Sequence, residues 1–279
     1  MKEATETPAV TRPSPRSDAG TGAHTAGQPL PGTKQSVPDL EEQVAYQRAF
    51  EAMVWAIPAM AIHRFRQGLY DIPGVEDNVV IAFSGTLKAR HEVITANTAV
   101  PYISAFLDLR KGPTVVDVPA ATDKASLYGQ VVDAWQVTIA GVGPSGPDKG
   151  AGGKYLFLPP GYEGAIPEGY FPIRSTSFRL ALAFRSVPGK GATQADAYAY
   201  TETLQVYPLA EAGNPQPTRF VDGLPLSIQT LPYYDIRALQ DIHDFVDVEP
   251  VQERDKVVIG MLATIGIEKG KPFNPAPKM

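Results

Sequence analysis

The sequence of 279 residues contains no cysteine. Disulfide bonds, zinc sites with thiolate ligands and cysteine nucleophiles are therefore excluded. Histidine is also scarce, and His24, His63, His91 and His243 lie too far apart to form a metal-binding motif of short spacing. These patterns predict no metal site and no cofactor. His63 follows an apolar run, so we expect it to be a packed or rim histidine.

Long apolar runs and an excess of positive charge are missing as well. The longest apolar run, 52–62, contains Pro58 and is far shorter than the about 20 residues that a membrane-spanning helix needs. No apolar stretch follows the first basic residue, so we see no intact secretory signal. The net charge of −5 argues against nucleic acid as a partner, because phosphate binding needs a concentrated positive field.

What is present fits a globular protein: 43% of the residues are hydrophobic and 20% are charged. Residues 1–36 are the exception, since they are rich in Pro, Thr, Ala, Gly and Ser. Such a segment buries too little apolar surface to offset the entropy lost on ordering, so we expect a disordered tail. We expect one domain over residues 37–265 and a linker over residues 266–279.

Helical patterns flank the centre of the chain. Pro38 suits a first helical position and acidic residues follow it, so a helix is expected from there to about Gly68. Pro58 should kink or split this helix, because it lacks a backbone donor. Three further helices are expected in the last third, at 196–207, 235–246 and 254–265.

In the central region apolar and polar residues alternate, which is typical of strands with one buried face. The run 178–184 places Phe178, Leu180, Leu182 and Phe184 on one face, which we expect to be in the core. The longest alternation, 127–139, predicts a single strand. Other strands are expected at 102–109, 114–118 and 154–158. Because Pro- and Gly-rich loops separate these runs, the pattern predicts a mainly antiparallel sandwich or barrel.

The recognised catalytic motifs are weak or missing. Gly141, Gly143 and Gly146 satisfy the G-x-G-x-x-G pattern, but Pro144 and Pro147 interrupt it and a strand follows. A dinucleotide site would need a helix there, so we interpret the segment as a hairpin loop. The sequence has no G-x-S-x-G elbow for a serine nucleophile.

Asp133 is the most unusual residue, since it falls on the apolar face of the longest predicted strand, between Val131 and Trp135. A buried carboxylate must find a partner, lie in a solvated cleft or take up a proton. It is either a ligand-contacting or acid–base group, or a structural carboxylate paired with an Arg or Tyr on a neighbouring strand. We favour the structural interpretation.

Several ordered motifs resemble the domain-of-unknown-function family numbered 1254. They are 94–102, 107–113, 128–130, 133–135, 152–155, 158–162 and 184–186. The resemblance extends over roughly residues 40–279 and implies a jelly-roll-like β-sandwich. It also implies a second sandwich after this one, from a companion family, which this chain does not reach. Because such proteins often carry export signals, it slightly favours a cell-envelope or secreted location.

Two functions of different class follow. The first is a non-catalytic assembly or ligand-binding module, expected to form a homo-oligomer; its candidate ligand contacts are Asn97, Trp135 and Lys154. The second is a hydrolase or lyase with a site around Asp133 and Asp108. Its candidate catalytic residues are Asp133, Asp108, Tyr102 and Arg185. We favour the first.

Overall fold

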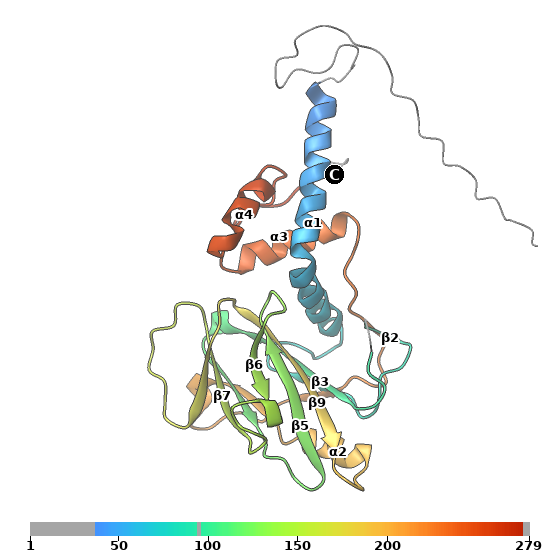
Figure 1. Cartoon of the computed structure of the whole chain (residues 1–279), viewed down its shortest axis with the longest axis vertical. Coiled ribbons are helices and arrows are strands. Elements are labelled where there is room, and N and C mark those ends of the chain that lie inside the picture. Colours follow the sequence, from blue (N-terminus) through green and yellow to red (C-terminus); the bar gives the residue numbers. More distant parts are fainter. Residues whose placement is uncertain (1–36, 94–95, 276–279) are drawn as a thin grey trace, which may run out of the picture. The chain divides into compact units, whose positions relative to one another are not determined.

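The computed structural model of the chain describes residues 37–93 and 96–275, with side chains from residue 40 onward. The chain divides into two units, Met1–Glu41 and Glu42–Met279. The predicted disordered tail, 1–36, lies outside the described residues. The second unit is mainly β, with three sheets and additional helices (Figure 1).

The largest sheet has six strands in the order β11-β1-β3-β9-β5-β6. Its strands are β1 (Val80–Ala82), β3 (Tyr102–Asp108), β5 (Ala125–Val132), β6 (Thr138–Val142), β9 (Arg179–Pro188) and β11 (Phe220–Asp222). The long strand β9 lies at the centre and pairs antiparallel with β3 on one side and β5 on the other.

A second sheet has the order β10-β4-β7-β8, and a small one pairs β12 with β2. Their strands are β2 (His91–Glu92), β4 (Thr114–Val118), β7 (Gly153–Leu158), β8 (Tyr170–Arg174), β10 (Gln205–Pro208) and β12 (Ile228–Gln229). Among the described residues, six of the nine strand pairings are antiparallel, as the sequence predicts.

The helices lie mostly at the two ends of the chain. The α-helices are α1 (Val37–Tyr70), α2 (Gln194–Thr201), α3 (Ile236–Val248) and α4 (Lys256–Ala263). Short 3-10 helices are η1 (Leu109–Lys111), η2 (Gly143–Ser145), η3 (Leu209–Glu211) and η4 (Glu253–Asp255). α1 continues through Pro58, so this proline does not split it.

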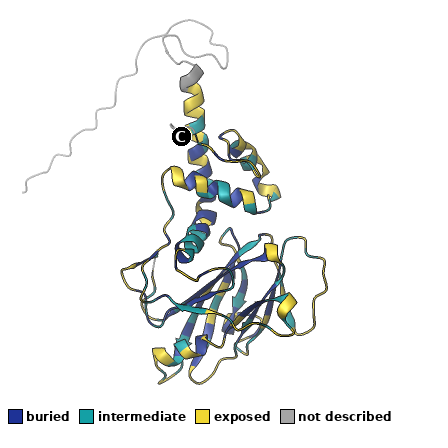
Figure 2. Ribbon diagram, turned by 180° about the vertical axis from the view of Figure 1, so that it is seen from behind, coloured by how far each residue is buried: buried dark blue, intermediate teal, exposed yellow. Residues whose placement is uncertain are grey.

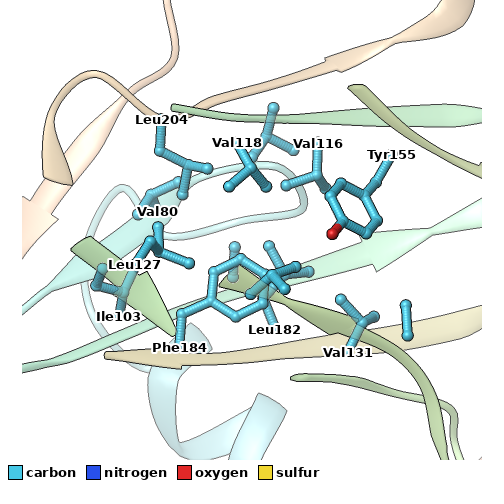
Figure 3. Packing of buried hydrophobic residues seen from close by; sticks show 14 of the residues in the cluster. Val80, Ile103, Val116, Val118, Leu127, Val131, Tyr155, Leu182, Phe184 and Leu204 are labelled. Atoms are coloured by element: carbon cyan, nitrogen blue, oxygen red, sulfur yellow. The ribbon is translucent and has the colours of Figure 1, made fainter. Parts of the chain in front are cut away.

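The main hydrophobic core lies between the six-stranded and the four-stranded sheet. Figure 3 shows Val116, Val118 and Tyr155 of the smaller sheet facing residues of the larger one. Leu180, Leu182 and Phe184 of β9 are buried in this core, which confirms their predicted orientation; Phe178, one residue before the strand, is only partly buried. Burial of alternate apolar residues fixes the register of β9, because a slip by one residue would turn them outward.

The opposite face of the six-stranded sheet is covered by the second half of α1. Phe106 of β3 and Ala181 of β9 pack there with Leu69 and, at its edge, Phe65. The rings of Phe65 and Phe106 meet edge to face, with centroids 5.3 Å apart. In Figure 2 the strands are mostly buried, whereas α1 alternates between buried and exposed residues. We call this surface, between the sheet and α1, the outer face.

A third cluster joins the helices. The alanines of the first half of α1 pack against Ile242 and Phe245 of α3 and Leu262 of α4. Ile267 and Phe273, which fall in the expected linker, are also buried in this cluster. Their burial explains why the chain after α4 stays packed on the helices.

Two predicted elements differ from the structure. The run 127–139 is not one strand: β5 ends at Val132, β6 begins at Thr138, and the residues between them form a tight turn. The predicted helix 196–207 ends at Thr201 and is followed by β10. In both segments the sequence predicts the first part of the element correctly. Pairing with β9 and β4 then decides where each element ends.

The glycine-rich segment after β6 is not a hairpin loop, since β6 and β7 belong to different sheets. No helix that could face a pyrophosphate opens there; Gly143 begins only one turn of 3-10 helix. Asp148 organises the loop by accepting hydrogen bonds from the backbone of Gly143 at 3.0 Å and from the hydroxyl of Tyr155 at 2.5 Å. Burial, reinforced by this carboxylate, raises the pKa of Tyr155.

Candidate functional site

A pocket of about 290 Å³ opens on the outer face, between the six-stranded sheet and α1. Ala183 of β9 is exposed although it lies at the centre of the sheet, because this pocket lies above it. The walls are mainly apolar. They are formed by Ala61, Ile62 and Phe65 of α1, by Phe83, Leu87 and Val93, by Val132 of β5, and by Leu231 and Pro232.

A few polar side chains line the same pocket. Ser104 of β3 is buried and lines the pocket. Gln130 of β5 accepts a hydrogen bond from Thr138 through its carbonyl oxygen at 2.9 Å, which leaves its amide donors free for a ligand. Tyr102, Gln136 and Thr230 complete the polar lining. An apolar pocket with a few convergent polar groups is the usual form of a small-molecule site.

The structure brings three of the candidate residues together beside this pocket. The Tyr102 hydroxyl accepts a hydrogen bond from the backbone N–H of Asn97 at 3.0 Å. The Arg185 guanidinium lies over the Tyr102 ring, 5.2 Å from its centroid, and Tyr102 and Arg185 are register partners on β3 and β9. These contacts orient the Tyr102 side chain at the edge of the pocket.

Asp133 and Trp135 lie elsewhere, in the turn between β5 and β6. Asp133 is 4% exposed, and its Oδ1 accepts hydrogen bonds from the backbone N–H groups of Trp135 and Val137, both at 2.9 Å. The prediction that Asp133 pairs with an Arg or Tyr on a neighbouring strand is wrong, because the backbone N–H groups of its own turn donate hydrogen bonds to it instead. Sequence alternation misses this, since it places Asp133 within a strand.

The turn that Asp133 holds inserts Trp135 among the helices. The Trp135 ring meets Trp55 of α1 and Phe245 of α3 edge to face, with centroids 4.9 and 5.0 Å away. Edge-to-face aromatic pairs add stability beyond the area that they bury. These contacts connect the β-sheet to the helical cluster, which favours a structural role for Trp135.

Asp108 and Lys154 are not part of the pocket. Asp108 lies at the other end of β3, where its carboxylate binds Arg110 at 2.5 Å. Burial opposes ionisation of Asp108, but the hydrogen bonds from Arg110 outweigh it and lower the pKa. Lys154 is exposed on β7 in the other sheet, with its ammonium 5.7 Å from the Tyr170 ring.

In the part of the chain that the structure describes, no three His, Asp or Glu side chains are grouped closely enough to hold a metal ion. None of the described helices has an apolar stretch long enough to cross a membrane. His63 is buried, which confirms that it is a packed residue.

Comparison with known families agrees with the motifs in the strands. Residues 78–208 match the model of the family described as "Protein of unknown function (DUF1254)". The match is consistent with a DUF1254 domain in this part of the chain. The matched segment contains the strands from β1 to β10 and supplies the floor of the pocket, whereas α1 and Leu231 lie outside the match. The matched segment is shorter than the resemblance over residues 40–279 that the sequence suggests.

The crystal structure of the VPA0106 protein from Vibrio parahaemolyticus has a similar fold, with a TM-score of 0.56 and 16% identity. The similarity covers 85% of this chain and 54% of that protein, so this chain spans about half its length. At this identity the likeness concerns the fold alone. No curated protein matches the sequence.

Proposed function

We propose that this chain is a binding module for a small, largely apolar molecule held in the pocket over Ala183. The observation that carries the proposal is the exposed alanine on the central strand of the six-stranded sheet, enclosed by apolar residues of α1 and of three loops. Filling this space would remove apolar surface from water, which favours binding by about 25 cal/mol per Å². The candidate ligand contact Asn97 acts here indirectly, through Tyr102.

The lining also limits the chemistry of the ligand. The cavity is at the lower end of the roughly 300–1,000 Å³ that ligand pockets occupy, so the ligand is small. Ser104 and the amide of Gln130 offer hydrogen bonds, whereas no charged side chain lines the pocket among the described residues. An uncharged molecule with an apolar body and one hydroxyl or carbonyl group fits this arrangement.

Fluorescence titration with 1-aminoanthracene, an apolar fluorophore with one amine, tests the proposal. In Ala183→Leu the larger side chain would occupy the pocket without displacing core residues, since Ala183 is exposed. We expect the variant to bind the fluorophore at least about tenfold more weakly than the parent. Ala210→Leu, at an exposed alanine of η3 outside the pocket, is the matched control and should bind like the parent. Equal affinity of all three proteins would contradict the proposal.

The alternative function remains a hydrolase or lyase site around Asp133 and Asp108. Each of these carboxylates accepts hydrogen bonds from its own turn, which favours a structural role for both. Tyr102 and Arg185 are adjacent, but neither Asp133 nor Asp108 lines their pocket. The pocket therefore supports ligand binding beside Tyr102 more than catalysis at the two carboxylates.

The finer predictions of a jelly-roll-like sandwich and of assembly into a homo-oligomer are also part of the proposal. The packing of two sheets around one core supports the first.

An apolar stripe on α1 supports assembly into a homo-oligomer, since its residues are each more than half exposed: Val44, Phe50, Val54 and Ile57. We propose that a second copy of the chain covers this stripe. Light scattering should give a dimer that Phe50→Ser with Val54→Ser converts to a monomer; a parent that stays monomeric would contradict it.

A further inference from the structure

A second, much smaller cavity lies on the outer face, beyond the ligand pocket. It measures about 10 Å³, and its polar lining consists of His63 and Arg66 of α1 and Arg179 of β9. The rest of its lining is apolar and includes Phe106, Leu180 and Phe245. About 10–15 Å³ is the space that a single water molecule needs, so the cavity has room for one occupant of that size.

Several buried nitrogen atoms of the side chains around this cavity have no hydrogen-bond partner. Nε and Nη1 of Arg179 and Nε of Arg66 are buried and have no hydrogen-bond partner. Nε2 of His63 also lacks one, with the nearest Asp241 oxygen 3.6 Å away. A guanidinium can only donate hydrogen bonds, and leaving its N–H groups buried without an acceptor is costly.

Asp241 approaches His63 but does not line the cavity. The three carboxylates nearest to the two arginines are engaged elsewhere. Asp77 accepts from Arg66 Nη2 at 2.8 Å, from Lys111 and from Tyr70. Asp108 binds Arg110. Glu249 accepts from the backbone N–H groups of Phe178 and Arg179 at 2.7 and 3.1 Å. Among the described residues no carboxylate oxygen forms an ion pair with Arg179, so its positive charge has no direct counter-charge.

We propose that this cavity binds one small monovalent anion, chloride, between Arg179, Arg66 and His63. An anion accepts hydrogen bonds from every side and neutralises the unpaired charge. Water fits less well, because its own hydrogens would need acceptors that the donor and apolar side chains of this lining do not supply. Burial, followed by the charge of the neighbouring Arg66, lowers the pKa of Arg179, as expected for a cation with too little counter-charge.

Thermal unfolding of the full chain in sodium chloride and in sodium gluconate of equal ionic strength tests this site. An anion that binds only the folded protein raises the midpoint with its concentration. We expect a rise of roughly 3–5 °C for each tenfold increase in chloride above its dissociation constant, and none in gluconate. Arg179→Met should abolish the difference between the salts. Arg185→Met is the control on the same strand and face, outside the small cavity, and should keep it.

A crystal soaked in sodium bromide provides a second readout that does not depend on any variant. We expect an anomalous peak beside the guanidinium of Arg179. Equal midpoints in the two salts, an Arg179→Met variant that still responds to chloride, or a bromide-soaked crystal without that peak would each overturn the proposal. If Arg179→Met fails to fold, the bromide crystal decides.

Discussion

The two ends of the outer face differ sharply, although the same strands and the same helix build both. At the Tyr102 end of β3 the sheet is open, and apolar residues of α1 enclose a pocket over Ala183. At the Asp108 end, about 20 Å away along the strand, α1 closes on the sheet and charged residues crowd together. Ile62 of α1 lines both cavities and so marks the boundary between them.

The difference follows from side-chain size and charge. Ala183 and Ser104 are small, so the sheet leaves space below the helix. At the other end Arg179 and Phe106 are large and fill most of that space. A sheet face covered by one helix can thus hold an open pocket at one end and a closed, charged contact at the other. The predictions below test whether the two ends are as separate as this description requires.

The largest expected effect concerns the core under both ends. Leu182→Ala truncates a side chain that is fully buried between the sheets, so it should lower the free energy of unfolding by about 2–5 kcal/mol. Denaturant unfolding measures this loss. Ala183→Ser, at the next residue on the opposite face, is the control and should change stability by less than about 0.5 kcal/mol. Similar losses in both variants would show that the faces of β9 are assigned wrongly.

The next effect concerns Asp133, which holds the turn beyond the end of β5. Asp133→Ala removes the acceptor of two partly buried backbone N–H groups and should cost about 1–3 kcal/mol. Asp133→Asn retains an acceptor oxygen in the same place, so we expect a smaller loss, because no buried cation is left uncompensated. Thermal or denaturant unfolding near neutral pH compares the two. An Asn variant as damaged as the Ala variant would mean that the charge itself is required.

Asp77 tests the charged end through its pH dependence. Burial opposes ionisation of this carboxyl, but hydrogen bonds from Tyr70, Arg66 and Lys111 outweigh it and lower the pKa. A carboxyl with a lowered folded-state pKa contributes stability above its unfolded pKa and loses it as the pH falls through the folded one. Asp77→Asn should therefore flatten the acid side of the stability profile. Asp71→Asn, at an exposed position, should leave that slope unchanged.

The smallest effect is expected at Lys154, which belongs to neither end. Its exposed ammonium lies over the Tyr170 ring, 5.7 Å from the centroid, so Lys154→Ala should change stability by less than about 0.5 kcal/mol. The same variant should bind 1-aminoanthracene like the parent, because Lys154 lies in the other sheet. A tenfold loss of affinity would extend the site to the four-stranded sheet.

The sequence predicts well those elements whose own period decides their structure. The strand around Leu182 lies where alternation places it, since one face is buried in the core, and the β-branched run 114–118 also forms the expected strand. It fails at Asp133 and at 202–207, where a turn or a partner strand overrides the local pattern.

The pocket could not have been found from the sequence. Its residues come from α1, β3, β5, β9 and loops far apart in the chain, and the key residue, Ala183, has no chemical signature. Strand alternation in the sequence points to Tyr102, so the sequence places one candidate at the site. The exposure of an alanine depends on what lies above it, and only the folded chain determines that.

Native mass spectrometry of the full chain, purified gently from cells, tests the central claim most directly. The account predicts that the parent carries one small apolar molecule per chain, which organic extraction releases, and that Ala183→Leu carries none. Ala210→Leu should carry the same molecule as the parent. The claim would be contradicted if the parent is free of small molecules and also fails to bind added 1-aminoanthracene, or if Ala183→Leu retains the same molecule at the same occupancy.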